Sequence, residues 1–138
     1  MTYIPAKLRR LVTSRANDRC EYCLIRNEDH YLPHEADHIL SEKHRGETTA
    51  KNLCLSCFDC NRYKGSDVGS FDLETGRFFP LYNPRTMQWS DHFRLDDARI
   101  IPLTPEGRIT EFLLRLNSPD RIVRRQALVE LKRYSDTE

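Results

Sequence analysis

The sequence predicts a small α+β protein in which a bound metal fastens two short strands to a helix. Its cysteines recur as two CxxC pairs, Cys20 with Cys23 and Cys57 with Cys60, a spacing typical of structural zinc sites. Between the pairs, short strand-like runs alternate with polar loops, and helical patterns flank them on both sides. The 138 residues suffice for one domain, or for a small domain with an extension.

Composition limits the classes of protein that this chain can be. Hydrophobic residues make up 38% of it, enough for a modest core, and no apolar run approaches the ~20 residues that span a bilayer. The net charge of +1 does not indicate a nucleic-acid partner, but basic residues cluster within 1–26 and again within 43–64. Because the N-terminus lacks an apolar signal-peptide segment, we expect a soluble protein of the cytoplasm, where disulfides are rare.

The first half of the chain has the pattern of a helix, a strand pair and a second helix. Pro5 is tolerated in a first helical turn, and Gly65 suits the position just after a helix. The predicted elements are a helix over 5–17, a loop over 26–33, a strand over 35–40, a loop over 41–51, a strand over 53–56 and a helix over 57–64.

The second half has a different character and predicts a β-hairpin followed by helices. A turn signal at 74–76 divides the hairpin predicted over 71–82, and a further strand is predicted over 99–103. A last helix is expected to begin at Ser118 and Pro119. The predicted apolar helix faces are Ile109, Phe112, Leu113 and Leu116 in one helix and Val123, Ala127 and Leu131 in the next. The change of character near Gly69 suggests a catalytic module over 1–69 and a C-terminal extension over 70–138 packed on it.

The fifth cysteine leaves a second metal register open. Cys54 lies three residues before Cys57, so these two could form the second pair instead of Cys57 and Cys60. The alternation of Leu53, Cys54 and Leu55 favours a buried strand residue at Cys54, since cysteine is often buried as a small hydrophobe. We therefore expect zinc on the two CxxC pairs; the remaining alternative is a chance set of buried thiols.

The segment from Cys20 to Gly65 resembles the HNH endonuclease family in residue type and in spacing. The matching features, in order, are Asp37-His38, Gly46, Asn52-Leu53, Cys60-Asn61 and Lys64-Gly65. Residues 83–117 are also similar to the extension of small standalone bacterial members. The resemblance implies a ββα-metal fold and hydrolysis of DNA phosphodiester bonds.

The resemblance also implies a role for each polar residue of the motif. His38 would be the general base, which suits an imidazole of pKa ~6.5. Asp37 and Asn61 would hold one catalytic metal, and their oxygen atoms suit Mg²⁺ or Mn²⁺. Asn52 would brace the loop between the strands and help to orient His38. Neighbouring strand residues point to opposite faces, so Asp37 and His38 can share a site only near the strand's end or on an irregular strand, and we expect the latter.

Three further groups of residues carry expectations of their own. Ser41 and Arg45 stand where the family often has Pro and Gly, which concerns the geometry of the loop that meets DNA. For His34 and His44 we expect a surface or packing role. The basic residues expected to contact nucleic acid are Lys43, His44, Arg45, Arg62 and Lys64.

Three functions compete on this sequence. The first is an HNH nuclease acting on DNA with structural Zn²⁺ and catalytic Mg²⁺ or Mn²⁺. The alternative is a non-catalytic zinc-binding module that binds nucleic acid or protein, which would need the cysteines but not Asp37, His38 and Asn61. The third, a nuclease toxin or defence effector, would use the same chemistry as the first. The sequence predicts no oligomeric state.

Overall fold

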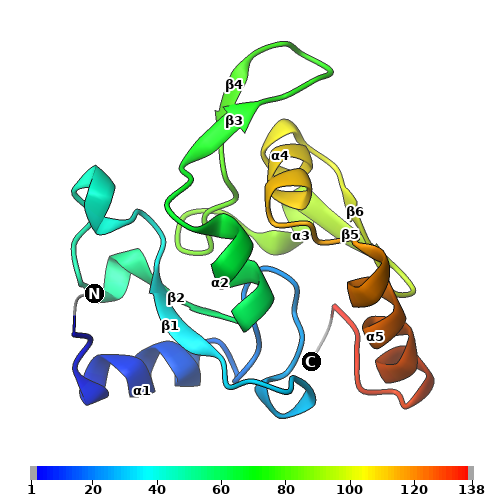
Figure 1. Ribbon diagram of the computed structural model, residues 1–138, viewed down its shortest axis with the longest axis horizontal. Helices are drawn as coiled ribbons and strands as arrows, with labels where there is room; N and C mark the ends of the chain where they lie inside the picture. The colour runs from blue at the N-terminus through cyan, green and yellow to red at the C-terminus, as the bar shows by residue number, and fades with distance from the viewer. Residues whose placement is uncertain (1–2, 137–138) are drawn as a thin grey trace. The chain divides into compact units, whose positions relative to one another are not determined.

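A computed structural model describes residues 3–136 of the chain (Figure 1). The chain divides into two compact units, one up to Asp67 and one from Val68 onward. Within the described part, no helix is long and apolar enough to cross a membrane.

The first unit contains a helix, an antiparallel hairpin and a second helix. In chain order its elements are α1 (Ala6–Arg15), the 3₁₀ turn Asn27–Asp29, β1 (Glu35–His38), the 3₁₀ turns Glu42–His44 and Ala50–Asn52, β2 (Leu53–Ser56) and α2 (Phe58–Lys64). This confirms the predicted α+β fold class with its ββα arrangement. The core is small: Val12 from α1 packs on Leu53 and Leu55 of β2.

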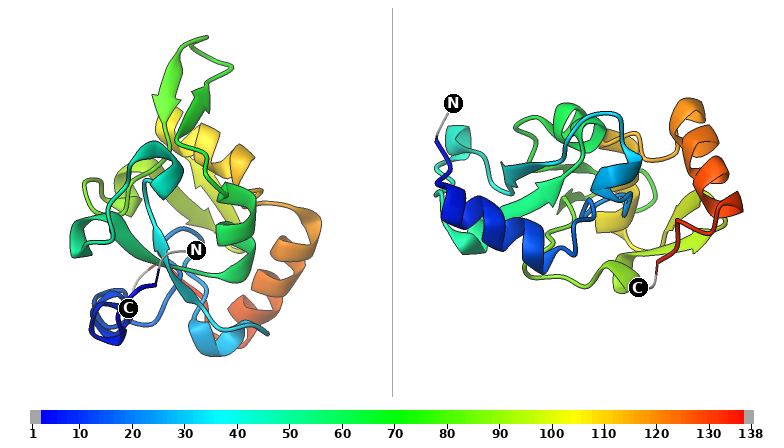
Figure 2. Two further views of the ribbon diagram at one scale, coloured as in Figure 1. Left: turned by 60° about the vertical axis from the view of Figure 1, so that its left-hand side comes forward. Right: turned by 90° about the horizontal axis from the view of Figure 1, so that it is seen from below.

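The two faces of the β1–β2 hairpin have different partners. Ala36 packs on the α1 side, within the small core. Glu35 and Asp37 alternate with it and therefore lie on the other face, where the side chain of Glu35 meets Asn61 of α2. The hairpin thus lies between the two helices (Figures 1 and 2).

The pairing of β1 with β2 is regular, contrary to our expectation of an irregular strand. Asp37 lies opposite Cys54, and His38 opposite Leu53. His38 is the last residue of β1, so the alternative of a site at the strand's end remains. The strand ends there, two residues earlier than predicted, because Leu40 bonds to the side chain of Asn52 instead of to a partner strand.

The second unit combines two hairpins with three helices. Its elements are β3 (Gly69–Phe71), β4 (Phe78–Pro80), α3 (Trp89–His92), β5 (Phe93–Asp96), β6 (Arg99–Pro102), α4 (Pro105–Leu113) and α5 (Pro119–Glu130). β3 pairs with β4, and β5 with β6, both antiparallel. The predicted hairpin, the strand near 99–103 and the two helices are all present.

The predicted apolar face of α5 is wrong. Val123, Ala127 and Leu131 are exposed, whereas Arg121 and Arg125 are buried. The buried guanidinium groups bond to carbonyl oxygens that the end of α4 and the following turn leave unpaired: Arg121 donates to Leu114 at 2.8 Å, and Arg125 to Leu116 at 2.7 Å.

The predicted apolar face of α4 and the predicted cap of α5 are each confirmed only in part. Of the four residues predicted to share a buried face in α4, Ile109 and Leu116 are buried, whereas Phe112 is exposed. Ser118 does precede α5, with Pro119 in its first turn, but the Ser118 side chain makes no capping hydrogen bond.

Candidate active site and metal centre

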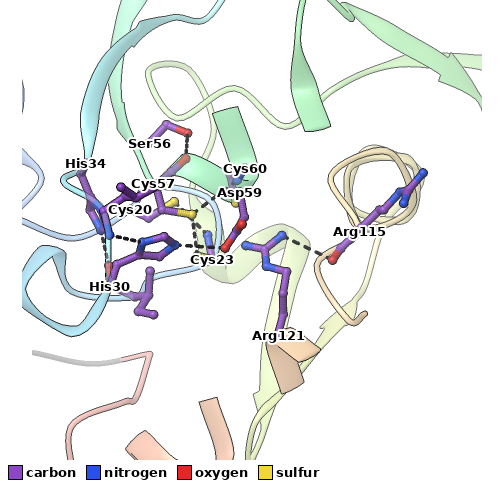
Figure 3. A network of polar contacts seen from close by, with 12 residues as sticks. Cys20, Cys23, His30, His34, Ser56, Cys57, Asp59, Cys60, Arg115 and Arg121 are labelled. Atoms are coloured by element: carbon purple, nitrogen blue, oxygen red, sulfur yellow. Dashed lines mark hydrogen bonds and ion pairs between the residues drawn. The ribbon is translucent and has the colours of Figure 1, made fainter. Parts of the chain in front are cut away.

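Four cysteines of the first unit converge on one buried point (Figure 3). The sulfur atoms of Cys20, Cys23, Cys57 and Cys60 lie within 4.8 Å of one another. The Cys23 and Cys57 sulfurs are 3.7 Å apart, close to the ~3.8 Å between thiolates around a tetrahedral zinc with Zn–S bonds of about 2.3 Å. The ligand chemistry and this separation both fit zinc.

Backbone amides support two of these sulfurs. The Cys23 N–H donates to the Cys20 sulfur at 3.5 Å, and the Cys60 N–H donates to the Cys57 sulfur at 3.4 Å. Burial, followed by the neighbouring thiols, raises the pKa of Cys20 well above its usual value. A divalent cation offsets this cost, because binding replaces the thiol protons.

Cys54 lies outside the cluster, and the four cysteines that come together are those of the two CxxC pairs. Its thiol is fully buried and donates to the Tyr22 hydroxyl at 3.6 Å. Burial raises the pKa of Cys54 to about 12, which keeps this thiol protonated at neutral pH.

An imidazole–carboxylate pair joins the loop after the first cysteine pair to the second pair. The Leu32 N–H donates to His30 Nδ1 at 3.1 Å, so Nε2 carries the ring proton and donates to Asp59 at 3.0 Å (Figure 3). Asp59 lies between Cys57 and Cys60 in the chain, and the bond therefore braces the second pair.

His34 and His44, for which a surface or packing role was expected, differ in environment. His34 is buried, and its Nε2 donates to the Ile25 carbonyl at 2.9 Å. Burial lowers the pKa of His34, so the ring is neutral and packs within the fold. His44 is exposed in the turn Glu42–His44.

Asp37 provides the clearest place for a second cation. One of its carboxylate oxygens, Oδ2, is buried and has no hydrogen-bond partner among residues 3–136. Burial raises the pKa of Asp37, and nearby Lys64 opposes that shift. A buried carboxylate oxygen without a donor is costly unless a cation or proton satisfies it, so this residue fits a hard divalent metal.

Asn61 is oriented by Glu35, which was not among the predicted site residues. The Asn61 amide nitrogen donates to Glu35 Oε2 at 3.1 Å. Because a carboxylate can only accept, this bond assigns the amide nitrogen to Glu35 and leaves the Asn61 oxygen for another partner. Glu35 is two residues from Asp37 on the same strand face, and strand periodicity could have indicated it.

His38 has one ring nitrogen engaged. Its Nε2 lies 2.8 Å from the Thr48 hydroxyl. Thr48 belongs to a loop pinned by Asn52, whose amide nitrogen donates to the carbonyls of Leu40 at 2.8 Å and Glu47 at 2.9 Å. Through these hydrogen bonds Asn52 holds the loop beside His38. No feature of the sequence had indicated Thr48.

The structure corrects one predicted nucleic-acid contact. Lys64 is only 2% exposed, and its ammonium donates to the His38 carbonyl at 3.1 Å. It therefore ties the end of β1 to α2 instead of reaching a ligand from the surface. The other predicted contacts are exposed: Lys43, His44, Arg45 and Arg62.

Comparison with known proteins identifies the first unit. Residues 20–67, which hold both cysteine pairs and all the polar residues above, match the family model described as HNH endonuclease. These residues, which we call the HNH module, therefore resemble the HNH endonuclease family. A nucleic-acid substrate is the general implication of this HNH module.

The similarity to one curated relative extends beyond the HNH module. The Septu protein PtuB of Bacillus thuringiensis is 26% identical over 125 residues, which cover 89% of this chain. The chain spans less than half of the relative's length, since the match covers 46% of it. No solved structure matches the chain significantly.

Replacing Gly46 by alanine is expected to distort the loop of the HNH module that carries Thr48. A Cβ at Gly46 would lie 1.7 Å from the Leu40 carbonyl oxygen. Because this oxygen belongs to the backbone, it can move away only if the chain itself shifts. Overpacking of this kind costs ~1–3 kcal/mol, so thermal unfolding should show a lower Tm. Thr49→Ala, an exposed change in the same loop, is the control; an unchanged Tm in Gly46→Ala would contradict the close approach.

Proposed function

We propose that the HNH module hydrolyses phosphodiester bonds of DNA, with His38 as general base and one Mg²⁺ or Mn²⁺ held by Asp37 and Asn61. The buried Asp37 oxygen without a donor, adjacent in the chain to an imidazole with one nitrogen engaged, is the observation that carries this proposal. A module that only binds nucleic acid has no need of either feature.

The residues around His38 suit a base that removes a proton from water. If Nε2 donates its proton to the Thr48 hydroxyl, the other ring nitrogen, Nδ1, carries the lone pair. Lys64 holds the His38 backbone through its carbonyl, and Asn52 holds the Thr48 loop. Rigid support of this kind keeps a base in hydrogen-bond reach of its substrate proton.

The proposed metal site combines a residue of the strand pair with a residue of helix α2, on the hairpin face that meets α2. Asp37 comes from β1, and Asn61 comes from α2, where Glu35 orients its amide. A divalent ion bound there would neutralise charge on the phosphate and stabilise the leaving oxygen. Asn61 directly follows Cys60, so zinc on the four cysteines would hold this end of α2 in place. The exposed Lys43, Arg45 and Arg62 would contact the DNA backbone.

A metal titration of plasmid cleavage tests the proposal. Zinc-loaded protein should nick supercoiled plasmid only when Mg²⁺ or Mn²⁺ is added. Asp37→Ala and Asn61→Ala should each need more metal for half-maximal rate, because each loses a proposed ligand, whereas Asn61→His should retain activity. Asp67→Ala, which removes an exposed carboxylate outside the site, is the control. Metal-independent cleavage, or titrations of both alanine variants that match wild type, would contradict it.

A further inference from the structure

The second unit contains a concave apolar surface that the proposed nuclease chemistry does not use. A cavity of about 590 Å³ lies between residues 70–74 of the β3–β4 hairpin and helix α4. Cavities of ~300–1,000 Å³ are typical of sites that bury a ligand group. We call this region, with Phe71, Leu73 and Phe112 at its edge, the hairpin–α4 surface.

Large apolar side chains at this surface remain in contact with water. Leu73 is 99% exposed, Phe112 75% and Phe71 67%. Single exposed apolar residues are ordinary, but a contiguous group beside a cavity marks an interaction site. The Phe71 ring packs edge-to-face on Phe78 with 5.5 Å between centroids, so at least one of these rings is held in place by the hairpin.

An ion pair between two lining residues joins the hairpin wall of the cavity to the helix wall. Arg108 of α4 donates twice to Asp72 of the hairpin, at 2.8 and 3.0 Å, and the Thr75 N–H donates to the same carboxylate at 3.0 Å. The paired guanidinium holds the pKa of Asp72 well below its usual range. Because the hairpin and helix are already joined, the cavity does not have to be assembled when a ligand binds, which lowers the entropic cost of binding.

The charges that line the cavity specify the sign of its partner. Asp72, Glu74 and Glu111 are acidic. Arg108 is the one basic lining residue, and it already pairs with Asp72 and Glu74. The lining therefore carries an excess of two negative charges at neutral pH. This excess repels nucleic-acid phosphates and attracts lysine or arginine side chains.

We infer that the hairpin–α4 surface docks a segment of a partner protein in which a large apolar side chain is flanked by lysine or arginine. The apolar side chain would enter the cavity beside Phe71 and Phe112, and the basic groups would pair with Glu74 and Glu111. The inference is independent of the nuclease proposal, because none of these residues belongs to the HNH module.

Selection from a random peptide library displayed on phage tests this inference on the full chain. Enriched peptides should combine an aromatic or large aliphatic residue with at least two basic residues. In fluorescence anisotropy, Phe112→Asp should raise the Kd of an enriched peptide about tenfold or more, as loss of an interface anchor does. Leu131→Asp, at a similarly exposed apolar residue directly after α5, should leave the Kd unchanged.

Charge reversal separates the electrostatic part of the inference from the apolar part. Glu111→Lys should weaken the same peptide and reduce the salt dependence of its binding, whereas Glu130→Lys, an exposed change on α5, should do neither. Circular dichroism checks that the variants fold. The inference is overturned if no peptide is enriched, if enriched peptides are acidic, if Phe112→Asp binds them as wild type does, or if sedimentation shows that a second copy of the chain occupies the surface.

Discussion

Alanine at position 38 is expected to reduce plasmid nicking ~10²–10⁴-fold, the usual effect of removing a general base. The imidazole is only partly buried, and within residues 3–136 its ring forms one hydrogen bond, with the Thr48 hydroxyl. Its loss should therefore leave zinc content and thermal unfolding nearly unchanged. The measurement is the initial nicking rate of zinc-loaded protein at saturating Mg²⁺ or Mn²⁺.

Thr49→Ala is the control for this change. Thr49 is an exposed residue of the loop that carries Thr48, and its replacement should keep a nicking rate close to wild type. A His38→Ala protein that cleaves as fast as wild type would remove His38 from the mechanism. A rate loss accompanied by a loss of zinc would indicate a folding defect instead of a missing base.

Cys60→Ser is expected to lose zinc and to unfold the first unit. Structural zinc contributes ~10–16 kcal/mol of apparent binding free energy in small zinc-finger peptides, and this unit has only a small apolar core around Val12, Leu53 and Leu55. The change also frees the residue before Asn61 from its metal anchor. Elemental analysis measures zinc per chain, and circular dichroism measures the loss of helix.

Cys54→Ser serves as the control, since it removes a buried thiol that lies outside the four-cysteine cluster. It should retain one zinc per chain and lose some stability, because the hydroxyl is less well suited to a fully buried site beside Tyr22. Zinc lost in Cys54→Ser but kept in Cys60→Ser would show that Cys54 and Cys57 form the second pair.

Sequence spacing predicted the four-cysteine cluster, with Cys54 and Cys57 as a second possible pairing, and the arrangement of the module. A CxxC pair brings two thiols together within one turn of backbone, so Cys20, Cys23, Cys57 and Cys60 could be grouped before any tertiary contact was known. Strand β2 and helix α2 were predicted within one residue, because Leu53–Ser56 is a short apolar run and Gly65 ends the helix after it. These are local properties of the chain.

Only the tertiary structure decided which charged side chains are buried and which apolar ones are exposed. Lys64 was expected to contact nucleic acid and Arg125 lies outside the predicted apolar face of its helix, yet each is buried and donates to backbone carbonyl oxygens. Phe112 and Val123 read as core residues, yet both are exposed. Helical periodicity identifies the residues that share a face, but the neighbouring elements determine whether that face meets water. Long basic side chains can satisfy unpaired carbonyl groups with their donors while their aliphatic stems pack as apolar residues do.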